Sequence, residues 1–335
     1  MKCRFGALFL ACLVLVVFSS FFALADPPSG AFSDQIESAR RAMSAKRYHD
    51  AISAFKKANK LQGDACYQCW LGIAASNLQM AEYKQALQAA DRAIVTAKDD
   101  AGRAVAHNLK GNILTSSADG PKDLSAAEEE YRAASQLNPG LAVYHLNYAT
   151  AMLRQSKDET ARKELEACLA AAPSEEQARQ ARMLLADPRR GRENFAPDFK
   201  VKLLSGEFAT LQQFSGKVLV MDFWATWCPP CRESVPELKQ LTKKYPAEKL
   251  ILISVSADED DGAWRDFVSK KHMDWLQYRD SDHQLVDAFG VHAFPTYLVI
   301  DGDGIIRQRI TGLNPQESVV RRLRATLESM PQLGK

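Results

Sequence analysis

The most regular pattern of apolar positions lies in residues 33–172, which are rich in Ala, Gln, Lys and Glu and poor in β-branched residues. Four times along this stretch, an Ala is followed by an apolar residue four positions later and by a small residue three positions after that. The four copies are Ala51, Phe55 and Ala58, then Ala86, Ala90 and Ala93, then Ala127, Tyr131 and Ala134, and finally Ala161, Leu165 and Cys168. Their first members are 35, 41 and 34 residues apart, so the pattern predicts repeated helix pairs that pack through small residues.

The residues around these copies resemble the tetratricopeptide repeat. The supporting residues are Ala39, Ala74 and Ala149, twelve positions before three of the copies, Trp70 at the family's aromatic position, and the closing residues Pro139 and Pro173. Residues 116–121 supply the insertion that the longer step needs. An irregular helical bundle with an accidental period is the alternative, and four nearly aligned copies argue against it. The resemblance predicts a helical solenoid over residues 32–186, with a capping helix at Glu175–Leu185 and a surface that binds a peptide or protein partner.

The second half of the chain has a different pattern, in which short apolar runs alternate with helical segments. The runs Val218–Met221, Leu250–Val255 and Tyr297–Ile300 are typical of buried strands, and a turn at residues 301–304 leads into a hairpin strand at Ile305–Ile310. The predicted helices are Cys231–Lys244, Ala263–Lys271 and Pro315–Ser329. This order predicts an α/β domain with a mixed sheet over residues 195–335, joined to the helical domain by a polar linker at residues 187–194.

The N-terminal segment is typical of an export signal. Lys2 and Arg4 precede an apolar run from Phe5 to Leu24, and residues 23–25 have the small-x-small pattern that signal peptidases recognise. We therefore expect residues 1–25 to be removed on export to the periplasm or cell envelope, with an uncleaved membrane anchor as the alternative. Without Lys2 and Arg4 the formal charge falls from +2 to zero, with 41 basic and 41 acidic residues, which predicts no nucleic-acid partner.

Cys228 and Cys231 stand at the predicted start of a helix, directly after a buried strand. A helix N-terminus stabilises a thiolate, which is the form that attacks disulfides, and the second thiol of such a pair resolves the mixed disulfide. Half of a zinc site is one alternative, but His272, His283 and His292 are isolated in the sequence and are expected to be surface or packing residues. A structural disulfide is the other alternative, although a bond across so short a loop stabilises little.

The context of this pair resembles the thioredoxin superfamily, and within it the exported TlpA/ResA-like thiol–disulfide oxidoreductases. The resemblance rests on Trp-x-x-Trp-Cys-Pro-Pro-Cys at residues 224–231 and on Phe-Pro-Thr at residues 294–296. The segments Ala196–Phe199 and Leu211–Lys217, with a short hairpin at Ser205–Gly206, are similar to the N-terminal extension of that branch. The resemblance covers about residues 195–330 and implies a thioredoxin-like fold.

This resemblance implies a role for each matching residue. Cys228 is the exposed nucleophile, Cys231 is the buried resolving thiol, and Pro295 is a cis-proline that faces the disulfide. Asp222 matches a buried acid whose raised pKa suits it to relay the proton of the resolving thiol, and a surface acid at a strand edge is the alternative. The implied substrate contacts are Trp227, Pro229, Pro230, Phe294 and Thr296, while Trp224 is expected in the core. The sequence departs from the branch at Ser234, where many members carry Glu.

The remaining cysteines and one acidic segment carry weaker signals. Cys66 and Cys69 form a second C-x-x-C at the start of a repeat helix, and we expect either a local disulfide or two buried small residues. Packing within its repeat is a sufficient explanation for Cys168. Residues 256–261 are acidic and follow a strand, and there we expect a solvated loop in preference to a metal site.

Together these features predict an exported enzyme that exchanges disulfides with protein substrates, and the family resemblance favours a reductase over an oxidase. The redox group is the Cys228–Cys231 disulfide, with no other cofactor, and the electrons come from a membrane-bound or exported donor. The repeats are expected to recruit a protein partner. Such an enzyme is expected to act in cytochrome c maturation or on cell-envelope proteins. The alternatives are a protein-binding repeat scaffold with a regulatory redox domain, and a thiol peroxidase.

Overall fold

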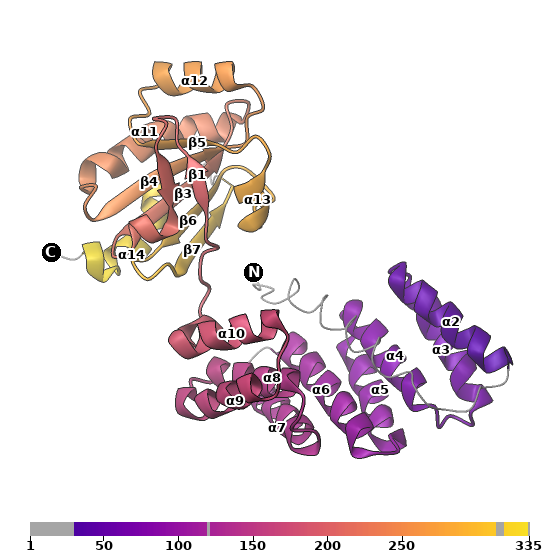
Figure 1. The fold of residues 1–335 in the computed structure, drawn as a ribbon. Helices are drawn as coiled ribbons and strands as arrows, with labels where there is room; N and C mark the ends of the chain where they lie inside the picture. Colours follow the sequence, from indigo (N-terminus) through magenta and orange to yellow (C-terminus); the bar gives the residue numbers. More distant parts are fainter. Residues whose placement is uncertain (1–29, 119–120, 313–317, 334–335) are drawn as a thin grey trace. The chain divides into compact units, whose positions relative to one another are not determined.

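The computed structural model describes residues 30–118, 121–312 and 318–333 (Figure 1). The chain divides between Arg192 and Glu193 into two compact units, which we call the repeat unit and the sheet unit. The predicted signal segment, residues 1–25, lies outside the described residues. Within the described residues, no helix combines the length and the apolar character needed to cross a bilayer.

The repeat unit is built from helices that pack in consecutive pairs (Figure 1). The pairs are α2 (Gly30–Ser44) with α3 (Tyr48–Leu61), α4 (Tyr67–Gln79) with α5 (Tyr83–Thr96), α6 (Asp100–Ser117) with α7 (Pro121–Leu137), and α8 (Ala142–Arg154) with α9 (Asp158–Ala170). All twelve residues of the four sequence copies are buried, which confirms the predicted packing pattern. The helix α10 (Glu175–Ala186) follows the last pair where the capping helix is predicted.

Two glycines show how closely consecutive helices approach each other, both between two pairs and within one pair. At Gly72 in α4, an added Cβ would lie 2.3 Å from the ring of Phe55 in α3. At Gly111 in α6, an added Cβ would lie 2.6 Å from the ring of Tyr131 in α7. An aromatic ring of one helix therefore packs directly on the backbone of its neighbour, and only Gly leaves room for that contact.

The predicted linker is wrong over residues 187–192, because this segment packs on the repeat unit. Pro188–Gly191 form a short 3-10 helix, η1, that contacts α8 and α10. Gly191 lies against Leu153, and Arg192 forms an ion pair with Asp158 at 2.6 Å. The polar and Pro/Gly character of the segment reflects a turn with buried contacts, which composition alone does not distinguish from a free linker.

The sheet unit begins with a hairpin and continues into a five-stranded mixed sheet (Figure 1). The hairpin strands are β1 (Lys200–Lys202) and β2 (Phe208–Thr210), followed by η2 (Leu211–Phe214). The sheet strands are β3 (Val218–Trp224), β4 (Leu250–Ser256), β5 (Leu276–Arg279), β6 (Thr296–Ile300) and β7 (Ile306–Thr311), in the order β5-β4-β3-β6-β7. The contacts β3–β4 and β4–β5 are parallel, whereas β3–β6 and β6–β7 are antiparallel. The predicted mixed α/β sheet is confirmed, and β5 is an additional strand.

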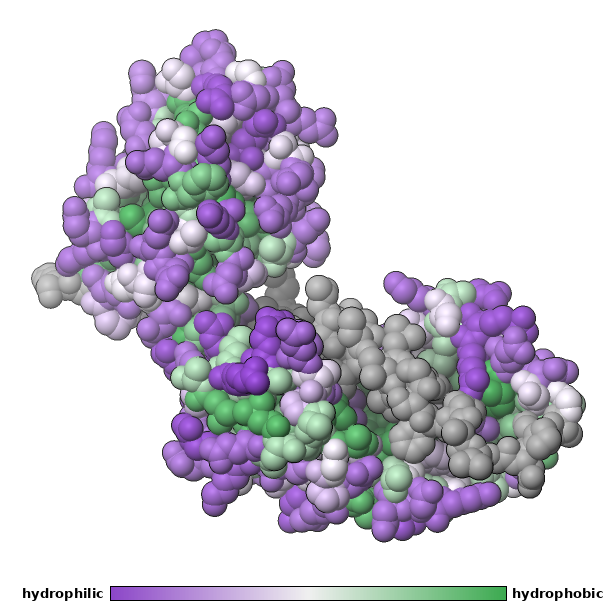
Figure 2. Space-filling view, in the orientation of Figure 1, coloured by the Kyte–Doolittle hydropathy of each residue, from purple (hydrophilic) through white to green (hydrophobic). Residues whose placement is uncertain are grey.

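Both faces of the sheet are covered. One face packs against α11 (Pro229–Lys244) and α14 (Val319–Glu328), through residues such as Leu238 and Leu323. The other face packs against the N-terminal extension, through Phe199 and Phe214, and against α13 (Gln284–Ala288), a helix absent from the predicted elements. Figure 2 shows that the visible surface of this unit is mostly hydrophilic, with hydrophobic residues showing in small groups.

Two further helices complete the sheet unit. The helix α12 (Asp261–Lys270) follows β4 where Ala263–Lys271 is predicted. The last predicted helix, Pro315–Ser329, is observed as α14, whose N-cap is Ser318; residues 313–317 lie outside the described residues. The helix α11 begins two residues earlier than predicted, because Pro229 and Pro230 fit its first turn, where no N–H donor is needed.

Candidate active site

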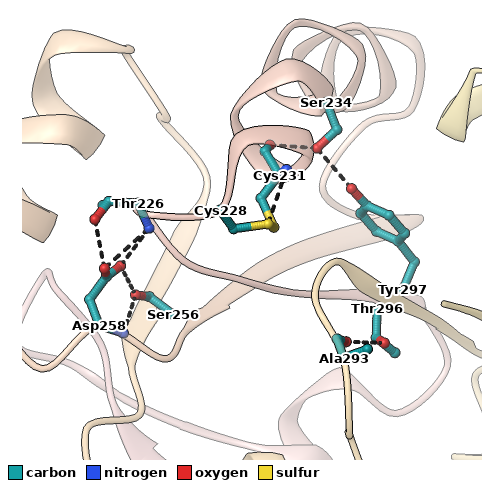
Figure 3. The surroundings of a disulfide bond; sticks show 9 residues. All are labelled: Thr226, Cys228, Cys231, Ser234, Ser256, Asp258, Ala293, Thr296 and Tyr297. Atoms are coloured by element: carbon teal, nitrogen blue, oxygen red, sulfur yellow. Dashed lines mark hydrogen bonds between the residues drawn. A yellow bond between two sulfur atoms is a disulfide. The ribbon is translucent and has the colours of Figure 1, made fainter. Parts of the chain in front are cut away.

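The Cys228–Cys231 disulfide lies at the end of the central strand and the start of α11 (Figure 3). Cys228 is the N-cap of this helix, and its Sγ accepts the backbone N–H of Cys231 at 3.3 Å. Pro229 and Pro230 occupy the two positions between them and carry no N–H. Cys231 is buried as predicted, at 2% exposure. Cys228 is only 4% exposed, so the prediction of an exposed cysteine is wrong, because Cys228 belongs to a buried apolar cluster with Trp224 and Val235.

A buried carboxylate fixes the loop between β3 and the disulfide. Asp258 accepts hydrogen bonds from the backbone N–H of Thr226 at 3.0 Å, from the Thr226 hydroxyl at 2.6 Å, and from Ser256 (Figure 3). The strands β3 and β4 are parallel and end at the paired residues Trp224 and Ser256. Thr226 and Asp258, which each follow two residues later, therefore lie at the same edge of the sheet. The predicted solvated loop at residues 256–261 is therefore wrong for Asp258, because its carboxylate is turned inward as a brace.

A row of polar side chains crosses the sheet on the face that α11 covers. Ser254, Asp222 and Tyr297 are neighbours in register on β4, β3 and β6, and all three are buried. The Ser254 hydroxyl donates to Asp222 Oδ2 at 2.7 Å, while Asp222 Oδ1 is buried and has no hydrogen-bond partner among the described residues. Burial raises the pKa of Asp222 to about 7, and the Ser254 hydrogen bond opposes that shift. Asp222 is buried as predicted.

Ser234 connects this row to Cys231. Its hydroxyl donates to the carbonyl oxygen of Cys231 at 2.7 Å and accepts the Tyr297 hydroxyl at 2.8 Å (Figure 3). Burial, and then the nearby charge of Asp222, raise the pKa of Tyr297, which keeps its phenol as a proton donor. The position where many family members carry Glu therefore holds a neutral hydrogen-bonded pair.

A groove of about 800 Å³ lies beside the disulfide. One wall is Trp227, Cys228, Pro229 and Pro230, and the other is Asp282, His283, Val286, Asp287, Val291, His292, Ala293 and Phe294. The Trp227 side chain is 63% exposed, and its ring meets that of Phe294 edge-on at 5.9 Å between centroids. The interpretation of His283 and His292 as ordinary surface or packing residues is incomplete, because the α13 region brings both to this groove. Four of the five predicted substrate contacts line it.

The prediction that the Thr296 side chain contacts substrate is wrong. Thr296 is the first residue of β6, it is 1% exposed, and its hydroxyl donates to the carbonyl of Ala293 at 2.7 Å (Figure 3). Its side chain therefore shapes the preceding loop and does not line the groove. The Phe294–Pro295 peptide bond is cis. Within the described part of the chain, neither the N–H nor the C=O of Phe294 makes an intramolecular hydrogen bond.

The other cysteines lie in the repeat unit. Cys66 and Cys69 form a disulfide at the start of α4, which decides between the two arrangements expected for them. Cys168 is a free thiol in the core of the last helix pair, and burial raises its pKa to about 11. Across residues 30–118, 121–312 and 318–333, no three His, Cys, Asp or Glu side chains are grouped so as to hold a metal ion.

Comparison with known proteins agrees with this geometry. The Redoxin family profile matches residues 192–327. Thiol-disulfide oxidoreductase ResA of Bacillus thuringiensis subsp. konkukian is 34% identical over 124 residues, which are 37% of this chain and 72% of the relative. Thioredoxin-like protein YneN of Bacillus subtilis is 34% identical over 131 residues, 38% of this chain and 76% of the relative.

Among solved structures, a putative thiol:disulfide interchange protein DsbE from Chlorobium tepidum is similar, with 28% identity over 42% of this chain and 97% of that chain, at a TM-score of 0.38. The match to ResA spans more than two thirds of that relative at more than 30% identity. The chain therefore belongs to the ResA-like thiol–disulfide oxidoreductases of the thioredoxin superfamily, with a helical repeat unit before the thioredoxin-like domain.

Proposed function

We propose that this oxidoreductase is an exported reductase that opens disulfides in protein substrates, with Cys228 as the nucleophile and Cys231 as the resolving thiol. The observation that carries the proposal is the position of Cys228 at a helix N-terminus inside a groove to which Trp227 and Phe294 contribute apolar surface. An exposed Trp227 and the unpaired backbone of Phe294 in the same groove support binding of an extended chain, through ring contact and strand-like hydrogen bonds.

The reaction proceeds as two exchanges. The Cys228 thiolate attacks one sulfur of the substrate disulfide, so that a mixed disulfide forms and the other substrate sulfur leaves as a thiolate. Cys231 then loses its proton and attacks Cys228 Sγ, which releases the second substrate sulfur and closes the Cys228–Cys231 bond. Two electrons pass to the substrate, and a thiol donor must restore the dithiol before the next cycle.

Asp222 accepts the proton of Cys231 in the second exchange. Its pKa of about 7 means that its carboxylate takes up and releases a proton near neutral pH. Its Oδ1 is buried and accepts no hydrogen bond within the described part of the chain, so one oxygen is available for this role. Tyr297 is the neighbour of Asp222 in register on β6, and through Ser234 it is connected to the Cys231 carbonyl at the start of α11.

The two prolines of the motif favour the reducing direction. A Cys thiolate at an N-cap is stabilised by the N–H groups of the first helical turn, and stabilising the reduced form makes a pair more oxidising. Pro229 and Pro230 remove two of those donors, which leaves the Cys231 N–H as the one donor to Cys228 Sγ among the hydrogen bonds of the described residues. The thiolate is therefore less stabilised, and the dithiol gives up its electrons more readily.

Two features support a location of the protein outside the cytosol. They are the signal-like sequence of residues 1–25 and the Cys66–Cys69 disulfide, a bond type typical of oxidising compartments. The repeat unit recruits a protein or peptide partner, because stacked helix pairs bury their apolar faces against each other and leave a long surface for recognition. The reaction needs no bound cofactor beyond the disulfide, and its electrons come from a membrane-bound or exported donor.

The reduction potential of the Cys228–Cys231 pair tests this proposal. The measurement uses residues 26–335 with Cys66, Cys69 and Cys168 changed to Ser, equilibrated in glutathione and dithiothreitol buffers. A reductase is expected to have a potential below about −250 mV, whereas a disulfide-forming oxidant lies nearer −120 mV. A value above about −180 mV contradicts the reducing direction and leaves the oxidoreductase activity itself intact.

Replacing Trp227 by Ala is expected to lower kcat/KM for a peptide disulfide about tenfold, because an exposed aromatic contact of this size contributes on the order of 1–2 kcal/mol. The reduction potential should not change, since Trp227 makes no bond to the sulfurs. The matched control is Phe208→Ala, which removes another exposed aromatic ring, 56% accessible, from β2 outside the groove. Equal losses in both variants would show that Trp227 has no specific role in substrate binding.

A further inference from the structure

The repeat unit holds a second cysteine pair whose local geometry matches that of the active-site pair. Cys66 is the N-cap of α4, as Cys228 is of α11, and in each pair the second N–H donates to the first Sγ, at 3.2 Å and 3.3 Å. The first cysteine is the more exposed in both, with 7% for Cys66 and 4% for Cys228, while Cys69 is fully buried. Cys66 is therefore at least as exposed a residue as Cys228, the cysteine proposed to perform exchange in the sheet unit.

Hydrogen bonds independent of the disulfide hold the turn in front of α4. Asn59 accepts the backbone N–H of Cys66 at 3.0 Å and donates to the Asp64 carboxylate at 3.0 Å. The Trp70 indole donates to the carbonyl of Asp64 at 3.0 Å. A disulfide across two intervening residues also removes little chain entropy from the unfolded state. The S–S bond is thus not what holds this turn, and its opening leaves the start of the helix in place.

The helix start at Cys66 differs from the one at Cys228 in its donors. Tyr67 and Gln68 occupy the two positions between the cysteines, and both carry the backbone N–H that proline lacks. The additional N–H groups of the first helical turn favour the Cys66 thiolate, and a more stable reduced form makes a pair a better electron acceptor.

We propose that Cys66–Cys69 is a second thiol-exchange site, which accepts electrons from a protein dithiol through attack at Cys66. The donor thiolate attacks Cys66 Sγ, a donor–Cys66 bond forms, and the Cys66–Cys69 bond breaks, with Cys69 leaving as a thiolate that takes a proton from solvent. The second donor thiolate then attacks the donor sulfur of the mixed disulfide, so that the donor is oxidised and Cys66 is released. Two electrons reach the repeat unit for each donor disulfide formed.

The test uses the full mature chain with Cys168, Cys228 and Cys231 changed to Ser, so that its outcome does not depend on the function proposed for the sheet unit. Reduced bacterial thioredoxin is the donor, and alkylation followed by mass spectrometry counts the thiols. We expect both cysteines to become reduced within minutes in native buffer, and to reoxidise when oxidised glutathione replaces the donor, with the helical circular dichroism unchanged. Reduction that occurs only at denaturant concentrations that unfold the helices would overturn the proposal.

Single-cysteine variants locate the attacked sulfur. In the same background, Cys69→Ser leaves the Cys66 thiol and the matched Cys66→Ser leaves the Cys69 thiol. We expect Cys66 to react with 5,5′-dithiobis(2-nitrobenzoate) at least about tenfold faster than Cys69, because thiol reactivity follows exposure and thiolate character. Equal rates would contradict attack at Cys66. If either variant fails to fold, mass-spectrometric trapping of the thioredoxin adduct on the intact pair still identifies the attacked cysteine.

Discussion

Changing Cys228 to Ser is expected to lower the rate of disulfide reduction by at least about 1,000-fold, because a hydroxyl at neutral pH supplies no nucleophile comparable to a thiolate. The sulfur that is lost is the N-cap atom at the groove, and the remaining Cys231 is 2% exposed behind it. The measurement is a single turnover of the reduced protein with a self-quenched fluorescent peptide disulfide. Cys66, Cys69 and Cys168 are changed to Ser so that only the sheet unit contributes.

The matched variant is Cys231→Ser, which keeps the nucleophile and removes the resolving thiol. It should attack at a rate within about tenfold of the parent and then stop at a mixed disulfide, which mass spectrometry detects as a covalent adduct. Cys228→Ser should form no such adduct. If Cys228→Ser accumulates the adduct and Cys231→Ser does not, the order of the two cysteines is the reverse of the one proposed.

The repeat unit was predictable from the sequence because its information is local and repeated. Each copy contributes residues such as Ala51 and Phe55 at helical spacing, and all of the copies turn out to be buried. A single copy would be ambiguous, since Ala-rich helices occur in many folds, but four copies at nearly one period specify stacked pairs. The segment 187–192 was not predictable, because its contacts with Leu153 and Asp158 join residues more than thirty positions apart.

The active-site pair was predictable because its chemistry lies within one short segment, from the strand to the helix start. The rest of the site comes from other parts of the chain. Strand β5 has four residues and α13 has five, which are too short for a hydrophobic period to show, and α13 carries one wall of the groove. A signal existed for Asp258: it stands two residues after β4, as Thr226 stands two residues after β3, and parallel neighbouring strands end at the same edge.

The buried polar residues next to the disulfide, which are Asp222, Ser234 and Tyr297, were only partly predictable. Asp222 could be placed in the core because apolar residues surround it in the sequence. The hydrogen bond between Ser234 and Tyr297 spans 63 positions, and no local pattern reports it. The substitution of Ser for the usual Glu of the branch is accommodated because Tyr297 donates to that hydroxyl. The chemistry of an active site is thus carried by short motifs, whereas its polar surroundings depend on which strands the fold makes neighbours.

Changing Asp222 to Asn is expected to stabilise the oxidised sheet unit at pH 8 and to slow its catalysis. Burial raises the pKa of Asp222 in the folded protein from 3.8 to about 7. Between these values the unfolded chain has lost the proton that the folded protein still holds, so the wild type loses stability as pH rises from about 4 to about 7. The wild type loses at most about 4 kcal/mol of stability in this way, and the Asn variant avoids that loss. A buried Asn amide without a hydrogen-bond partner at the Oδ1 position costs about 1–3 kcal/mol, which offsets part of the gain.

The measurement is urea unfolding followed by tryptophan fluorescence, which reports mainly the sheet unit because four of the five tryptophans lie there. The free-energy difference between Asp222→Asn and wild type should increase with pH from 5 to 8 and then level off. Release of the mixed disulfide by Cys231 should slow about 100-fold in the variant, since Asn accepts no proton. The control is Asp280→Asn, which removes a buried carboxylate that accepts the N–H groups of Leu285 and Val286 and should destabilise the sheet unit where Asp222→Asn stabilises it. A difference that is constant with pH would mean that Asp222 does not titrate in this range, and the proton would then have to leave Cys231 by another route.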